Sequence, residues 1–139
     1  MTIALTSSGL MKFRNTIQQM DQLQIRRENG TAADVVVLRL TGPLIISNLF
    51  EFQEICRETG SAHVIVDLAD VPYIDSAGLG SILAHWSHTQ RHGRKFALTG
   101  VSPRIDTLLE ITKVKSVLPG YATVAEAEAA FGGSGQAHA

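Results

Sequence analysis

The chain alternates short apolar runs rich in β-branched residues with segments whose apolar residues recur every three or four positions. Runs of the first kind predict buried strands, and the second pattern predicts amphipathic helices. Because neighbouring parallel strands need crossover helices, the alternation predicts an α/β domain with a mixed central sheet. Strands are expected near residues 23–27, at 35–40, 63–68 and 94–98, and around Val117; helices are expected over 48–59, from 76 to about 93, from 103, and from 124 to near Phe131.

Capping residues mark the expected starts of these helices. Asn48 with Glu51, and Thr123 with Glu126, have the spacing of capping boxes, and Ser102 precedes a proline at the first helical position. These signals agree with the helical periodicity that follows each of them.

The longest expected helix begins at Ser76 and carries an apolar stripe. Trp86 extends the spacing of Leu79, Ile82 and Leu83. Trp86 is therefore predicted to be buried against the sheet, and its replacement by alanine is expected to destabilise the fold by about 3–5 kcal/mol.

Both ends of the chain differ from this body. Residues 1–21 form an N-terminal extension in which Phe13, Ile17 and Met20 have helical spacing, so we expect a short amphipathic helix there. Its apolar face would pack either on the core of the same chain or on a second copy, giving a homodimer. Residues 132–139 are rich in glycine and are expected to form a flexible tail.

Composition limits the partners of this chain. Its 139 residues suit one domain, and 12 Lys and Arg against 13 Asp and Glu leave no basic surface for direct nucleic-acid binding. No run of eighteen apolar residues predicts membrane insertion, and no signal peptide is evident. The single cysteine, Cys56, excludes an internal disulfide and suits a reducing compartment. A cytoplasmic location is expected.

One turn carries the most specific signal. The stretch V-I-V-D-L-A-D-V-P-Y-I-D-S-A-G-L-G-S-I-L, followed by G-R-K-F-A-L-T-G-V-S-P, resembles the STAS domain of anti-sigma-factor antagonists. The resemblance covers residues 22–131 and implies a single STAS-like domain, a small mixed sheet with helices packed mainly on one face. The most specific part of the match is Asp75-Ser76-Ala77-Gly78-Leu79.

The resemblance implies regulatory binding without catalysis or a cofactor. Ser76 matches the serine that an anti-sigma factor kinase phosphorylates, and Asp75 matches the acidic residue before it. In similar proteins the unmodified form binds the anti-sigma factor, phosphorylation releases it, and a phosphatase resets the cycle. The segment 75–79 is then the expected partner-binding turn. From the residues alone, an unmodified helix cap is the favoured interpretation of Ser76, and the resemblance favours the modified serine.

A second function fits a STAS-like fold, namely an accessory subunit bound to the ATPase of an ABC transporter, with the same turn as its docking surface. The chain also departs from the antagonist pattern at Ile45, where an acidic residue usually follows the strand-ending glycine. The loop around Ile45 is expected to lie near Ser76, and its apolar residue could serve a different partner surface.

Three histidines share one face of the helix that Ser76 begins. His85, His88 and His92 have i+3 and i+4 spacing, which suits either a solvated polar face or metal capture. We expect the solvated face, with these side chains pointing outward, because no carboxylate or cysteine on that helix completes a metal site. A serine-hydrolase site is disfavoured because the nucleophile-elbow motif is absent.

Overall fold

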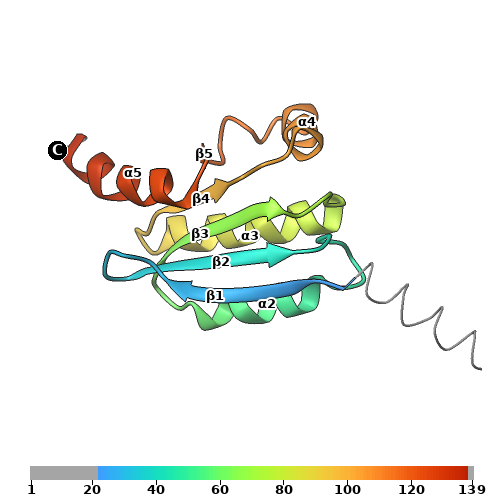
Figure 1. Ribbon diagram of the computed structural model, residues 1–139, viewed down its shortest axis with the longest axis horizontal. Coiled ribbons are helices and arrows are strands. Elements are labelled where there is room, and N and C mark those ends of the chain that lie inside the picture. Colours follow the sequence, from blue (N-terminus) through green and yellow to red (C-terminus); the bar gives the residue numbers. More distant parts are fainter. Residues whose placement is uncertain (1–21, 138–139) are drawn as a thin grey trace, which may run out of the picture.

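The computed structural model describes residues 22–137, with side chains as far as residue 132. Five strands form one sheet in the order β1-β2-β3-β4-β5 (Figure 1). The edge strand β1 is antiparallel to β2, and all other neighbours are parallel. The prediction of a mixed α/β sheet is therefore confirmed. The strands are β1 (Gln24–Asn29), β2 (Val35–Thr41), β3 (His63–Asp70), β4 (Phe96–Thr99) and β5 (Gly120–Tyr121).

Four helices connect and cover the strands in the described part of the chain: α2 (Leu49–Glu58), α3 (Ser76–Arg91), α4 (Pro103–Ile111) and α5 (Val124–Ala137). In Figure 1, α2 and α3 lie behind the strands, side by side. Helix α4 packs on the same apolar cluster as α2 and α3, whereas α5 covers part of the opposite sheet face. Helices thus lie mainly on one face, as predicted.

The two faces of the sheet follow from the period of two in its strands. Along β2, Val36, Leu38 and Leu40 join the large cluster under α2 and α3, whereas Val35 and Val37 join the smaller cluster under α5. Successive side chains of a strand point to opposite faces, so a continuous apolar run is buried on both. This arrangement explains why β2 lacks the polar alternation of a half-exposed strand.

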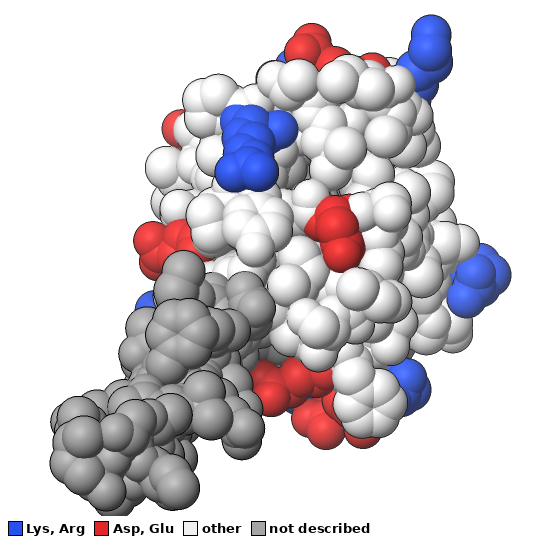
Figure 2. All heavy atoms as spheres, turned by 90° about the vertical axis from the view of Figure 1, so that its right-hand side faces the viewer, with Lys and Arg blue, Asp and Glu red and all other residues white. Residues whose placement is uncertain are grey.

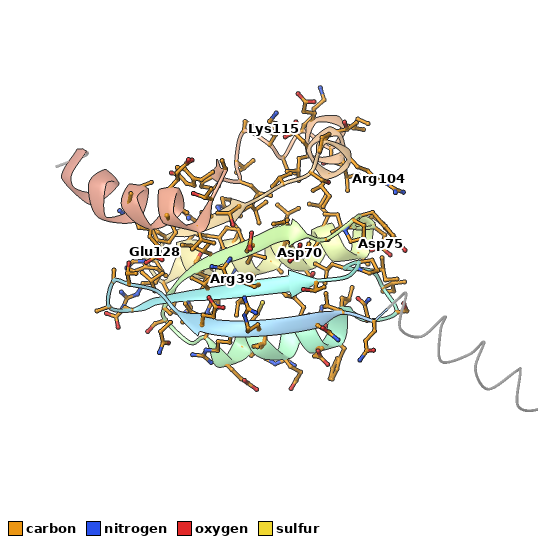
Figure 3. The ribbon with its side chains drawn as sticks, viewed as in Figure 1. Arg39, Asp70, Asp75, Arg104, Lys115 and Glu128 are labelled. Carbon is orange, nitrogen blue, oxygen red and sulfur yellow. The ribbon has the colours of Figure 1, made fainter. Side chains whose placement is uncertain are left out.

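On the sheet face that carries α5, the part that α5 does not cover has polar side chains that link four strands. Arg39 donates to Glu28 of β1 at 2.9 Å and to Asp67 of β3 at 2.9 Å (Figure 3). The hydroxyl of Thr99 on β4 donates to Asp67 at 3.0 Å. Each charge meets an opposite charge on the neighbouring strand, so this ladder favours the observed register.

Several element boundaries differ from the sequence-based expectation. Asn48 flanks α2 without a capping hydrogen bond to it, because its side-chain oxygen accepts from Ile45 N–H instead. The short strand lies at 120–121 and not around Val117, which belongs to the turn after α4. Ser102 and Thr123 do cap their helices as predicted.

Helix α5 extends to Ala137, so the predicted end near Phe131 is wrong. The glycine-rich segment suggested a stop, yet Gly132 lacks the positive φ that a terminating glycine adopts. Whether 132–139 is flexible stays a prediction. The amphipathic helix expected around Phe13, Ile17 and Met20 lies outside the described residues.

The register of α3 also corrects a prediction. Trp86 is only half-buried at the edge of the large cluster, whereas His85 is 4 % exposed and takes the core-facing position. The ring of His85 meets Phe52 and Phe96 edge-on, with centroid distances of 6.4 and 5.8 Å. Positions 85 and 86 follow Ile82 by three and four residues, so either side chain could face the core. The ring contact with Phe52 of α2 places His85 there.

This register predicts unequal costs for two aromatic truncations. Phe52→Ala removes a fully buried ring and should lower the free energy of unfolding by about 3–5 kcal/mol. Trp86→Ala should cost about 1–3 kcal/mol, because part of the indole already contacts solvent. Urea denaturation of both variants measures the difference, and an equal or larger loss for Trp86→Ala would contradict the register.

Candidate functional site

The candidate site lies where the parallel strands β2 and β3 end. Their carboxyl ends lead into adjacent loops, residues 42–48 before α2 and residues 71–75 before α3. Leu44 holds the loops together through its backbone. Its N–H donates to the Tyr73 carbonyl at 3.3 Å, and its carbonyl accepts from Asp75 N–H at 3.3 Å. An isolated parallel bridge between Leu44 and Ile74 thus extends the pairing of β2 and β3 into these loops.

Asp75 is the residue that ties these loops to α3. One carboxylate oxygen accepts from Gly78 N–H at 2.7 Å and so caps the helix. The other accepts from Ile46 N–H in the neighbouring loop at 2.9 Å. One carboxylate therefore satisfies backbone donors from the first turn of α3 and from a loop that is far away in sequence.

The environment of Asp75 favours its charged form. Desolvation acts to raise the pKa of its carboxyl group, but the backbone N–H groups of Gly78, Ile46 and Ala77 outweigh it together. The net result is a pKa below the ordinary value of 3.8. Asp75 is consequently a fixed negative charge at physiological pH.

Ser76 is the first residue of α3 and not its cap, which corrects the expectation that Ser76 could cap the helix. Asp75 has taken the capping role because its longer side chain also reaches the neighbouring loop. Ser76 is exposed, and its hydroxyl makes no hydrogen bond within residues 22–132. A hydroxyl that has no structural task can be modified without the loss of a fold-stabilising contact.

Gly78 allows the two loops to approach so closely. A Cβ placed on Gly78 would lie 2.1 Å from the Leu44 carbonyl oxygen. No real Cβ contact is that short, so any other residue must push the 42–48 loop away from α3. Leu79, the next residue, is 5 % exposed and anchors the first turn of α3 in the core.

The expected partner-binding residues therefore divide into two groups. Ser76 is exposed and Asp75 and Ala77 are half-buried, so these three offer surface to a partner. Gly78 and Leu79 are buried and position the turn from behind. Direct contact with a partner through Gly78 or Leu79 would require the turn to open.

Two exposed apolar side chains in or just after the 42–48 loop were not predicted from the sequence. Ile46 is 71 % exposed and lies in the loop that Asp75 binds, and Phe50 in the first turn of α2 is 68 % exposed. The signal available was the apolar residue Ile45 at the position where the family pattern has an acid, with Ile46 next to it. A contiguous exposed apolar patch marks a contact site, whereas single exposed apolar side chains are ordinary.

Charged side chains are scattered over this end of the molecule (Figure 2). Asp70 and Asp75 lie near the strand ends, and Arg104 of α4 lies near the same end (Figure 3). The Arg104 guanidinium stacks over the Tyr73 ring at 4.9 Å from its centroid. The surface around Ser76 therefore has no strong charge of one sign, which suits a partner held mainly by apolar and polar contacts.

The histidines of α3 do not form the outward-facing row that was expected. His85 is buried, while His88 and His92 are near the surface with ring centroids 4.3 Å apart. Within residues 22–132, the structure contains no group of three or more His, Cys, Asp or Glu side chains that could hold a metal ion. Nor does any described helix have the length and hydropathy that crossing a bilayer requires.

The fold and the exposed serine at the start of α3 define a small single-sheet α/β domain with a candidate modification site at its strand ends. The STAS domain family model matches residues 7–127. The chain belongs to the STAS domain family and is related to anti-sigma factor antagonists.

Three relatives illustrate this similarity. The anti-sigma-B factor antagonist of Staphylococcus epidermidis is 29% identical over 99 residues, which cover 69% of this chain and 92% of that protein. An anti-sigma factor antagonist from Mycobacterium paratuberculosis superposes with a TM-score of 0.72 at 18% identity, covering 80% of this chain and 95% of the other. The anti-sigma factor antagonist SpoIIAA in its unphosphorylated form gives 0.67 at 19% identity, with coverage of 79% and 97%.

The close approach at Gly78 leads to a test with an internal control. Gly78→Ala should lower the free energy of unfolding by about 2 kcal/mol or more, because its Cβ would collide with the Leu44 carbonyl. Gly80→Ala, two residues along the same helix, meets no atom within 4 Å and should stabilise by about 0.5–1 kcal/mol. Thermal or urea unfolding compares the pair. Similar effects of both substitutions would contradict the packing of the 42–48 loop on α3.

Proposed function

We propose that this protein is an anti-sigma-factor antagonist in a partner-switching circuit. The unmodified protein binds an anti-sigma factor kinase, phosphorylation of Ser76 releases that partner, and a phosphatase restores the binding form. The observation that carries the proposal is the exposed Ser76 hydroxyl, the first residue of α3, beside the fixed charge of Asp75.

The geometry is compatible with a phosphate on Ser76. A helix N-terminus presents unpaired N–H groups and a positive dipole end, and a negative charge there is favoured by about 0.3–1 kcal/mol. The fold should therefore tolerate the modification. Family membership supports this view, as does the fact that Bacillus SpoIIAA has been solved in a phosphorylated form.

The effect on a bound partner would be the opposite. Phosphorylation adds about −1.5 to −2 charges next to Asp75, whose carboxylate is already committed to Gly78 and Ile46. A partner surface that fits a neutral hydroxyl would have to desolvate this charge. A loss of about 2.8 kcal/mol corresponds to a hundredfold weaker complex.

Apolar contact is the second part of the proposed interface. Ile46, whose N–H donates to Asp75, and Phe50, in the first turn of α2, both expose most of their side chains. An interface whose core is apolar and whose rim is polar is typical of transient complexes. In this chain Ile45 stands where the family pattern has an acid and its neighbour Ile46 is exposed, so we infer a partner with a matching apolar patch.

The remaining parts of the proposal concern setting and chemistry. We propose a cytoplasmic protein that acts by binding, with no catalytic step of its own and no direct contact with nucleic acid. The formal net charge of −1 supports the last point. Ser76 also has no histidine partner within the described side chains, so nothing there would activate it as a nucleophile.

The switch is tested with immobilised wild type, Ser76→Ala and Ser76→Asp as baits in lysate of the source cell. The anti-sigma factor kinase should be captured by wild type and Ser76→Ala, and much less by Ser76→Asp, although one carboxylate copies a phosphate imperfectly. Ser116→Asp, an exposed serine remote from the turn, is the matched control and should bind like wild type. Incubation of the wild type with the captured kinase and ATP, followed by mass spectrometry, should place the phosphate on Ser76.

Capture of all baits in equal amounts, or a phosphate at another residue, would contradict the proposed switch. Capture of a permease-associated ATPase instead of a kinase would favour the transporter-subunit function. In the same experiment, Phe50→Ser should reduce capture while leaving the thermal midpoint almost unchanged, because the Phe50 side chain is mostly in solvent.

A further inference from the structure

A groove between α2 and α3 lies outside the Ser76 site. It has a volume of about 360 Å³, within the range of small-molecule sites. Ser81, one of its lining residues, follows Ser76 along α3 by more than one helical turn. The lining residues come from both helices: Gln53, Cys56, Arg57, Ser81, Ala84, His85, His88 and Arg91.

His85 is the unusual residue of this groove. It is 4 % exposed, and its Nε2 is fully buried without a hydrogen-bond partner in the described part of the chain. A buried polar atom without a partner costs about 1–3 kcal/mol, and such atoms are rare in folded proteins. Desolvation, helped by the charge of nearby His88, lowers the pKa of His85 to about 4, and the ring is neutral at physiological pH.

The charged side chains that line the groove, apart from its histidines, are arginines. Arg57 of α2 and Arg91 of α3 line it from opposite helices, and no lining residue is acidic. Arg57 pairs with Glu54 and Arg91 donates to Ser87, but a guanidinium has five N–H donors, and each keeps some for a ligand. The groove therefore favours an anion.

The thiol of Cys56 is one of the groups that line the groove. Burial raises the pKa of Cys56 to about 12, so the thiol stays protonated at physiological pH and does not act as a nucleophile. Cys56 and Ala84 instead give apolar surface next to the imidazole of His85.

We propose that this groove binds a small organic anion, with its carboxylate or phosphate held by Arg57 and Arg91 and its apolar body against Cys56 and Ala84. A polar atom of the ligand would pair with the imidazole of His85. The site is independent of the switch at Ser76 and does not rest on it.

Phenyl phosphate is a suitable probe, because it joins a ring to a phosphate. In two-dimensional NMR titrations of the full chain, it should cause saturable shifts at Cys56, Ser81 and His85. The double variant Arg57→Gln with Arg91→Gln changes exposed side chains and should bind at least about tenfold more weakly. Arg27→Gln with Lys113→Gln removes the same net charge from exposed positions elsewhere and should bind like wild type.

Two further arms test the roles of the imidazole and of the organic body. His85→Phe keeps a ring against Phe52 and Phe96 but removes the hydrogen-bonding nitrogens, so binding should weaken without a fall in the thermal midpoint. Inorganic phosphate should bind more weakly than phenyl phosphate. The proposal is overturned if no saturable shifts occur in the groove, if the two double variants bind equally, or if bare phosphate binds as tightly as phenyl phosphate.

Discussion

The candidate site depends on one carboxylate that joins the first turn of α3 to the neighbouring 42–48 loop. Asp75 accepts from Gly78 N–H within its own helix and from Ile46 N–H across the strand ends. This bridge is possible only because Gly78 leaves room for the Leu44 carbonyl. Together these contacts fix where α3 begins, and they leave Ser76 at its first position with an exposed hydroxyl that bonds to none of the described residues.

In the same arrangement, the residues that stabilise the turn are different from the residues that a partner would contact. The side chains that hold the turn, Leu79 and the Asp75 carboxylate, bond or pack inward, whereas Ser76, Ile46 and Phe50 face solvent. A phosphate on Ser76 would therefore change the surface that a partner meets without breaking a bond that holds the turn. In the proposed circuit, the domain stays folded in both states, and only the affinity for the partner differs.

The strand and helix pattern could be predicted from the sequence, because apolar periodicity reports burial and the resemblance covers most of the chain. Details that depend on packing between elements could not. Serine and aspartate both cap helices, and the structure places Asp75 at the cap, where its carboxylate also accepts from Ile46 N–H. Likewise Trp86 is the more apolar candidate for the core, yet the position of Phe52 on α2 places His85 there.

The pH dependence of two backbone amides tests the central role of Asp75 most directly. The proton resonances of Ile46 and Gly78 N–H should titrate together in the folded protein, with one midpoint below 3.8, since both donate to a carboxylate whose pKa is lowered. The stability that this carboxylate contributes is present above its unfolded-state pKa and is lost as the pH falls through that midpoint. Asp75→Asn should abolish the common titration. Separate midpoints for the two amides, or a titration that survives in Asp75→Asn, would contradict the account.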